Sequence, residues 1–209
     1  MPGHLILASA SPRRVQLLAQ VGVIPVDIAA AEIDEAPQSG ELPSQTAARL
    51  GRAKAQAIAI KFPDDFVLGA DTVVACGRRL LNKPVDAVEA RRYLELLSGR
   101  RHRVHGAICV SAPGGRAHER LVTTQVSFKR LTGAEIDAYI ASGEWEGKAG
   151  GYAIQGRAEG FVKGIKGSYS NVVGLALFET LALLDGLGVT SPSERGARQN
   201  EGQRVAHDS

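Results

Sequence analysis

The sequence predicts an α/β fold, and two observations carry this prediction. Short apolar runs alternate with amphipathic helical stretches, beginning with a strand at 5–8 and a helix from residue 12. Further along, strand-like segments at 101–110 and 121–128 flank the turn Pro113-Gly114-Gly115 and predict an antiparallel hairpin. The chain has 209 residues, a length that fits one large domain or two small lobes.

The first strand and helix meet at a tight turn. Leu5–Ala8 is a short apolar run that suits a buried strand. Ser11 is expected to N-cap the helix, with Pro12 at its first position, where the missing N–H costs nothing. Gly22 can end the helix.

This junction is a candidate phosphate site. Exposed N–H groups at a helix N-terminus favour an anion. Arg13 and Arg14 fall in the first turn, where each cation costs roughly 0.3–1 kcal/mol unless an anion offsets it. We therefore consider a phosphate site made of Ser9, backbone amides and at least one arginine. Two solvated arginines on an ordinary βα unit are the alternative.

A second short strand is expected at 25–29, and acidic residues follow it. Glu32, Asp34 and Glu35 precede a proline- and glycine-containing loop. Such clusters are usually solvated loop residues. The functional interpretation is a carboxylate that binds a hard cation.

The next helix is expected to start at an N-cap Ser44 and run to about residue 60. Lys54 is four residues from both Leu50 and Ile58, so it lies on the apolar face. A lysine there either extends to the edge of that face or meets an anion. The flanking residues Arg49 and Arg52 are expected to contact water.

The longest strand-like run, Phe66–Cys76, is interrupted by Asp71. An ionised carboxylate in apolar surroundings costs several kcal/mol unless it is paired, hydrogen-bonded or bound to a metal. Asp71 is therefore either a structural group with backbone donors or a catalytic group at the mouth of a cleft. In a regular strand, Thr72 points to the opposite side.

The remaining chain continues the alternation of strands and helices. Capping-box patterns begin two helices, one from Asp86 to Leu97 and one from Thr132. A hairpin strand is expected at 78–81, a further strand at 161–165 and a closing helix at about 175–184.

A glycine-rich segment spans residues 147–156. Glycine at this density lets a backbone approach a ligand closely. Lys148 and Gln155 are its candidate polar contacts, one charged and one able to pair with a base edge. An ordinary glycine-rich hairpin is the alternative.

Composition limits the function classes. The net charge of +3 permits an anionic ligand but does not suggest a nucleic-acid coat. Cys76 and Cys109 form no metal-binding pattern. No apolar run reaches the length of a membrane span and no signal peptide is evident, so we expect a cytoplasmic protein with no membrane partner. The polar residues 190–209 are expected to form a disordered tail.

These pieces together resemble the Maf family of nucleoside triphosphate pyrophosphatases, over about residues 5–186. No single motif carries the resemblance, which rests on their order. The motifs are Leu7-Ala8-Ser9-Ala10-Ser11-Pro12-Arg13-Arg14, Ala53-Lys54-Ala55, Gly69-Ala70-Asp71-Thr72-Val73-Val74, Lys83-Pro84, Leu97-Ser98-Gly99-Arg100, Lys148-Ala149-Gly150-Gly151-Tyr152, Ile154-Gln155-Gly156 and Gly167-Ser168-Tyr169-Ser170-Asn171-Val172-Val173-Gly174-Leu175.

The resemblance implies a two-lobed Maf/ITPase-like α/β fold around a long bent mixed sheet, with a central cleft, as a single domain over residues 1–189. It implies hydrolysis of a nucleoside triphosphate to the monophosphate and pyrophosphate with a divalent cation, Mg²⁺ or Mn²⁺. The Tyr-Ala-Ile-Gln stretch resembles the branch that acts on dTTP and UTP. A homodimer is plausible by family. A triphosphate-binding regulator of cell division with little turnover is the alternative.

The resemblance also implies roles for particular residues. Asp71 matches the catalytic carboxylate, and together with Glu35 it is the candidate metal ligand. Positions tied to substrate choice or to the cleft are matched by Ser9, Arg13, Lys54, Thr72, Lys83 and Gln155, to which the residue analysis adds Arg14 and Lys148.

Three positions depart from the family pattern. Gly106 stands where a threonine is expected, Gly147 replaces an acid before Lys148, and Ala176 replaces a proline. The first two are expected to alter the cleft lining.

Overall fold

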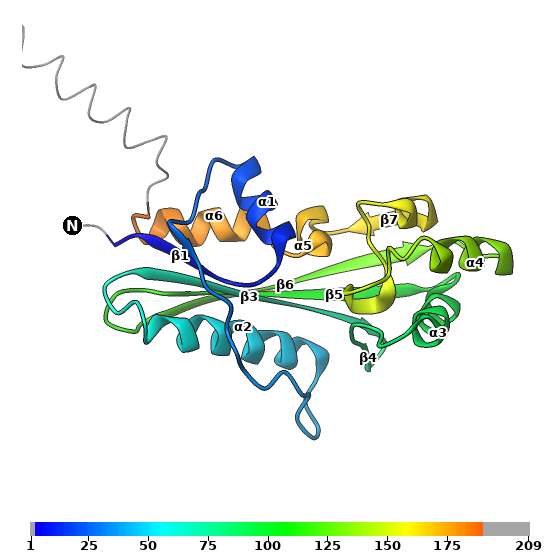
Figure 1. The fold of residues 1–209 in the computed structure, drawn as a ribbon, viewed down its shortest axis with the longest axis horizontal. Coiled ribbons are helices and arrows are strands. Elements are labelled where there is room, and N and C mark those ends of the chain that lie inside the picture. Colours follow the sequence, from blue (N-terminus) through cyan, green and yellow to red (C-terminus); the bar gives the residue numbers. More distant parts are fainter. Residues whose placement is uncertain (1–2, 190–209) are drawn as a thin grey trace, which may run out of the picture.

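The computed structural model describes residues 3–189. The polar tail expected at 190–209 lies outside the described residues. Within them the chain forms one seven-stranded mixed sheet with helices on both sides, which confirms the predicted α/β class. Figure 1 shows α2 beneath the sheet, with α1, α5 and α6 above it.

The sheet has the strand order β2-β1-β3-β5-β6-β7, and β4 pairs with β3 outside this path. β1 pairs in parallel with β2 and β3, and all other pairs are antiparallel. The strands are β1 (Leu5–Ala8), β2 (Asp27–Ile28), β3 (Phe66–Cys76), β4 (Arg79–Leu81), β5 (Arg101–Ser111), β6 (Ala117–Phe128) and β7 (Val162–Lys166).

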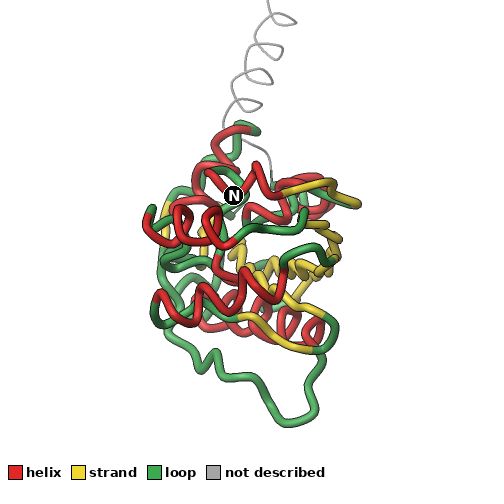
Figure 2. Tube along the Cα trace, turned by 90° about the vertical axis from the view of Figure 1, so that its right-hand side faces the viewer, coloured by secondary structure: helices red, strands yellow, loops and turns green. Residues whose placement is uncertain are grey.

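The helices cover both faces of this sheet. Figure 2, turned by 90°, shows red helices above and below the yellow strands. They are α1 (Pro12–Gln20), α2 (Pro43–Ala59), α3 (Ala87–Leu97), α4 (Gly133–Ala141), α5 (Tyr169–Val173) and α6 (Leu177–Gly186), with 3₁₀ turns η1 (Ala149–Gly151) and η2 (Arg157–Phe161). The main apolar core lies on the face opposite α2, where alternate residues of β3 such as Leu68 and Val74 are buried.

Several element predictions are confirmed. β1 and β3 have the expected bounds, and β5 and β6 form the expected hairpin. The capping box of α4 is present, because Thr132 Oγ1 accepts from the Glu135 N–H and the Glu135 carboxylate accepts from the Thr132 N–H. Asp86 caps α3 through the Glu89 N–H, although the Glu89 carboxylate accepts from Val85 rather than from Asp86.

The N-terminal ends of two helices differ from expectation. Ser11 occupies the N-cap position of α1, but its side chain makes no capping hydrogen bond. The N-cap of α2 is Leu42 rather than Ser44, because Pro43 already takes the first helical position. The Leu42 N–H is satisfied by the Gln45 side chain at 2.8 Å, so this end needs no serine.

Three further segments differ from prediction. β2 is reduced to Asp27–Ile28, at the edge of the sheet, instead of 25–29. The alternative of a glycine-rich hairpin at 147–156 is wrong, because the segment forms η1 and a turn. The closing helix begins at Leu177, since the preceding residues form the short helix α5, which is capped by Ser168.

The feature that positions the site is a gap along one edge of β3. On this edge β1 pairs with residues 66–69 of β3, and β4 pairs with residues 74–76. Residues 70–73 have no strand partner there within the described chain, while β5 pairs continuously with 67–75 on the other edge. The gap therefore exposes one edge of a central strand without breaking the sheet.

A buried polar pair lies in the core, between β5 and the segment after η1. The His102 ring packs edge-on against Phe128 and Tyr152, and its Nε2 lies 2.8 Å from the Tyr152 hydroxyl. His102 Nδ1 is buried without a hydrogen-bond partner among residues 3–189. Burial lowers the pKa of His102 to about 4. The imidazole is therefore neutral in the folded protein.

This neutral histidine predicts an acid-side loss of stability. The pKa of His102 falls from 6.5 in the unfolded chain to about 4 on folding, so in this interval the unfolded state binds the extra proton. The free energy of unfolding should drop by about 3 kcal/mol as the pH falls through that window. Urea denaturation across the window should show a shallower pH slope for His102→Gln, and equal slopes would contradict the assignment.

Candidate active site

A cleft of about 620 Å³ lies at the gap in β3. Its walls come from the β1–α1 junction, the loop after β2, α2, β3, the segment after β4, and the segment around η1. The sequence-predicted site residues all line it: Ser9, Arg13, Arg14, Glu35, Lys54, Asp71, Thr72, Lys83, Lys148 and Gln155. The fold thus brings together residues from six separate parts of the chain. Their individual roles stay predictions.

The centre of the cleft is a lysine shared by two carboxylates. Lys54 Nζ lies 2.7 Å from Asp71 Oδ1 and 2.6 Å from Glu35 Oε1. Asp71 is only 7% exposed, so its charge requires such a partner. Lys54 therefore meets an anion, one of the two alternatives for a lysine on this helix face, and the anions belong to the chain itself.

Glu35 is ionised at neutral pH. Partial burial favours its neutral form, but the hydrogen bond and charge of Lys54 outweigh this effect, and Lys83 and Arg14 add to it. The net result is a pKa below the usual range for a glutamate. The carboxylate is thus charged when it pairs with Lys54.

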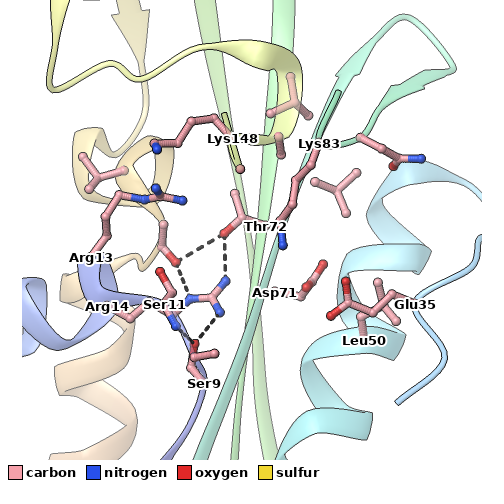
Figure 3. Close-up of a pocket in the computed structure, with 18 of the residues that line it drawn as sticks. Ser9, Ser11, Arg13, Arg14, Glu35, Leu50, Asp71, Thr72, Lys83 and Lys148 are labelled. Carbon is pink, nitrogen blue, oxygen red and sulfur yellow. Dashed lines mark hydrogen bonds between the residues drawn. The ribbon is translucent and has the colours of Figure 1, made fainter. Parts of the chain in front are cut away.

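The opposite wall is organised by Arg14. Its guanidinium donates from Nε to the Gly174 carbonyl at 2.9 Å and from Nη1 to Ser9 Oγ at 2.9 Å. Nη2 donates to Thr72 Oγ1 at 3.3 Å, and the Thr72 hydroxyl donates to the same Gly174 carbonyl. Figure 3 shows this network on one side of β3, with Asp71 and Glu35 on the other. Arg14 therefore joins the residue after β1, the strand β3 and the residue after α5.

The two walls follow from the pleat of β3. Asp71 and Thr72 are adjacent and extend to opposite sides of the strand, as expected for a regular strand. Both reach the cleft, because the cleft lies at the open edge of β3 rather than over one face. One wall therefore carries the carboxylates and the other the Arg14 network.

Three further cations face the cleft. Arg13, Lys83 and Lys148 line it, and none forms a salt bridge within the described part of the chain. Burial lowers the pKa of Arg13 and of Lys148, and for Lys148 the charge of Arg13 contributes. With Arg14 and Lys54, five cations surround two carboxylates, so the cleft is suited to a polyanion.

The segment that carries Gln155 is held by residues outside the predicted site. The Tyr139 hydroxyl accepts from the Ala153 N–H at 2.9 Å, and the Asn82 carbonyl accepts from the Gly150 N–H at 3.1 Å. A Glu144 carboxylate oxygen accepts from the Arg157 N–H at 2.8 Å. Sequence reasoning missed these supports, because their partners are distant backbone groups that no local pattern indicates.

The contacts of Arg49 also differ from the sequence-based expectation. It was expected to contact water, but its guanidinium binds both oxygens of Glu41 and the Ala36 carbonyl. The partners lie in the irregular loop before α2, where the sequence has no period to place them. Arg52, also assigned to water, pairs with Glu119 while its side chain stays 56% exposed.

Two carboxylates in the cleft are the candidate metal ligands. Within residues 3–189, no group of three or more His, Cys, Asp or Glu side chains could hold a metal ion. Mg²⁺ commonly binds through one or two carboxylates together with substrate phosphates. Glu35 and Asp71 could hold a hard cation together with phosphate oxygens and water, and this role stays a prediction.

Two of the three residues that depart from the expected family pattern do not line the cleft. Gly106 faces Asn171, whose Oδ1 would lie 1.8 Å from a Cβ at position 106, and neither residue lines the cleft. Gly106 is therefore not part of the lining itself, and an effect of this position on the lining stays a prediction. Gly147 does line the cleft, with φ +65°, and Ala176 is the buried N-cap of α6.

Comparison with known proteins gives consistent matches. Residues 4–187 match the model of a family described as "Maf-like protein". A protein of Paramagnetospirillum magneticum named dTTP/UTP pyrophosphatase is 62% identical over 184 residues, covering 88% of this chain and 97% of that one. Proteins of the same name from Sphingopyxis alaskensis and Caulobacter vibrioides are 60% and 56% identical, each over 88% of this chain and over 97% and 95% of their own lengths.

A solved structure is more distantly similar. The Mycobacterium abscessus nucleoside-triphosphatase / dITP/XTP pyrophosphatase aligns with a TM-score of 0.40 and 19% identity, over 61% of this chain and 73% of that one. This similarity is too low to support a functional inference.

The two neighbouring arginines should differ sharply in their effect on stability. Arg14→Ala removes three hydrogen bonds from a buried charged group and should lower the free energy of unfolding by about 2–4 kcal/mol. Arg13→Ala should change it by about 0.5 kcal/mol or less. Urea denaturation of both variants measures the difference, and equal losses would show that Arg14 does not hold the walls together.

Proposed function

This chain belongs to the Maf family, and we propose that its cleft hydrolyses dTTP and UTP to the nucleoside monophosphate and pyrophosphate, a house-cleaning activity. One observation carries the proposal: a buried, lysine-paired Asp71 stands at the open edge of β3 in a cleft that contains five cations. The names and high identity of the relatives support the same substrates.

The free cations suit the phosphate chain. Attack of water on the α-phosphorus of a triphosphate requires that the phosphate charges be neutralised. Arg13, Lys83 and Lys148 carry no competing carboxylate among residues 3–189. They would bind the phosphate oxygens and hold the α–β bond over the gap.

Asp71 would act on the attacking water. Its carboxylate would accept a proton from that water or orient it, while Lys54 holds the carboxylate in place at 2.7 Å. A bond then forms between the water oxygen and the α-phosphorus, and the α–β bridging bond breaks with pyrophosphate as the leaving group. Glu35 and Asp71 would hold a divalent cation, Mg²⁺ or Mn²⁺, which supplies further charge neutralisation on the phosphates.

Gln155 and Thr72 are the proposed selectivity residues. The Gln155 side chain can both donate and accept hydrogen bonds, as the edge of a pyrimidine base requires. Thr72 already bonds Arg14 and the Gly174 carbonyl, so it would act mainly by fixing the shape of the wall. Ser9 would help to fix the shape of this wall through its hydrogen bond with Arg14.

The remaining predictions concern the alternative function, the binding partners and the cellular location of the protein. A nucleotide-binding regulator with little turnover remains the alternative function, and it has no support from the relatives, which are named as enzymes. No helix among residues 3–189 is long and apolar enough to cross a bilayer. A cytoplasmic location, a homodimer and the absence of nucleic-acid binding stay predictions.

Asp71→Asn tests the chemical role directly. The substitution keeps the shape and removes the proton acceptor, so pyrophosphate release from dTTP and UTP should fall by about 10²–10⁴-fold. Asp137→Asn, at an exposed ion pair on α4, serves as the matched control and should keep wild-type turnover.

The outcome that would contradict the role is specific. If Asp71→Asn keeps the thermal stability of the wild type and still releases pyrophosphate within a few-fold of it, Asp71 is not the catalytic carboxylate. If the wild-type protein binds dTTP and UTP without releasing pyrophosphate, the regulator alternative gains the support that it now lacks.

A further inference from the structure

The loop that carries Glu35 has no regular structure of its own. It connects β2 to α2 over residues 29–42 and is the long blue segment that runs past the sheet and below α2 in Figure 1. Ala29 and Ala31 pack on the cluster around Ile6 at its start, whereas most side chains from Glu32 to Glu41 are exposed. Burial therefore does little to fix the part that contains Glu35.

Two side chains of α2 hold this part of the loop. Lys54 pairs with Glu35 at 2.6 Å. Arg49 donates from Nε and Nη2 to the two oxygens of Glu41, at 2.7 and 2.9 Å, and from Nη2 to the Ala36 carbonyl at 3.0 Å. Ala36 directly follows Glu35, so the second contact fixes the backbone next to the carboxylate.

The two contacts differ in strength. The Glu35 side chain is 51% exposed although that of Lys54 is only 12% exposed, so water screens the carboxylate end of this pair, and the flexible lysine must be immobilised to make it. Arg49 instead forms a planar fork on Glu41, whose side chain is only 9% exposed. The hydrogen bond from Arg49 lowers the pKa of Glu41 to about 2, so the fork persists at neutral pH.

We propose that Arg49 is a positioning residue for the hydrolysis: its fork on Glu41 and its bond to the Ala36 carbonyl hold the loop so that the Glu35 carboxylate stands beside Lys54 and Asp71. Arg49 itself lies outside the residues that line the cleft. Its effect on turnover rests on the proposed function, whereas its effect on the loop does not.

The test replaces the Arg49 guanidinium and keeps its positive charge. Arg49→Lys can pair with Glu41 but cannot bind both of its oxygens and the Ala36 carbonyl in one plane. Since a small misplacement of a catalytic group is costly, kcat should fall by roughly 10- to 100-fold and the metal concentration needed for half-maximal rate should rise. Arg52→Lys, on the same helix but paired with Glu119 of β6, is the matched control and should stay within about twofold of wild type.

A double-variant cycle separates positioning from general loss of structure. If Arg49 acts through Glu35, Arg49→Lys should have no further effect on kcat in a Glu35→Gln background. Multiplied losses in the double variant would overturn the proposal. A double variant whose kcat equals that of Glu35→Gln alone supports the proposal. A merely structural role of Arg49 would instead lower kcat in both backgrounds alike.

Amide hydrogen exchange supplies a readout that needs no turnover. Amides of residues 32–41 should exchange faster in Arg49→Lys than in wild type or Arg52→Lys, with no change in β3. Unchanged exchange in this segment would overturn the proposal even if kcat fell. If the wild-type protein released no pyrophosphate, the proposed function would fail, whereas exchange would still decide whether Arg49 holds the loop.

Discussion

One shared lysine organises the centre of this protein. Lys54 on α2 meets Asp71 on β3 and Glu35 on the loop before α2, at 2.7 and 2.6 Å. A carboxylate as buried as Asp71 would be strongly destabilising without a paired cation. Because the three groups come from a helix, a strand and a loop, their ion pairs connect α2 to the sheet and bring Glu35 of the loop to the same place. The same ion-paired cluster is the one that a phosphate chain and a cation would have to enter.

The sheet makes room for this cluster by leaving part of β3 unpaired. β1 and β4 share one edge of β3 and stop short of each other, so residues 70–73 face the cleft. At an open edge, side chains from both faces of a strand reach the same space, which ordinary sheet packing forbids. The carboxylate wall and the Arg14 wall therefore face one another across a single strand. Two walls of different character suit a ligand that has both phosphates and a base.

Much of this arrangement could be predicted from the sequence, because burying a charged side chain costs free energy that a local sequence pattern reveals. Asp71 stood out because an apolar strand does not tolerate an unpaired charge, and the spacing of Lys54 placed it on the buried helix face. The gap in β3 could not be predicted, since it depends on where two distant strands pair. The role of Arg49 was missed for a related reason: its partners, Ala36 and Glu41, lie in a loop without periodicity. The N-cap of α2 was misassigned because Pro43 moves the helix start before Ser44.

The position of the reacting phosphate in the cleft is the central claim. A crystal structure of the protein with Mg²⁺ and the non-hydrolysable α,β-imido analogue of dUTP tests this most directly. The account predicts the α-phosphate at the gap in β3, within hydrogen-bonding reach of Lys54 or of a water held by Asp71, with the β- and γ-phosphates among Arg13, Lys83 and Lys148. An analogue bound with its α-phosphate outside this gap, or with Asp71 and Lys54 turned away from it, would contradict the central claim.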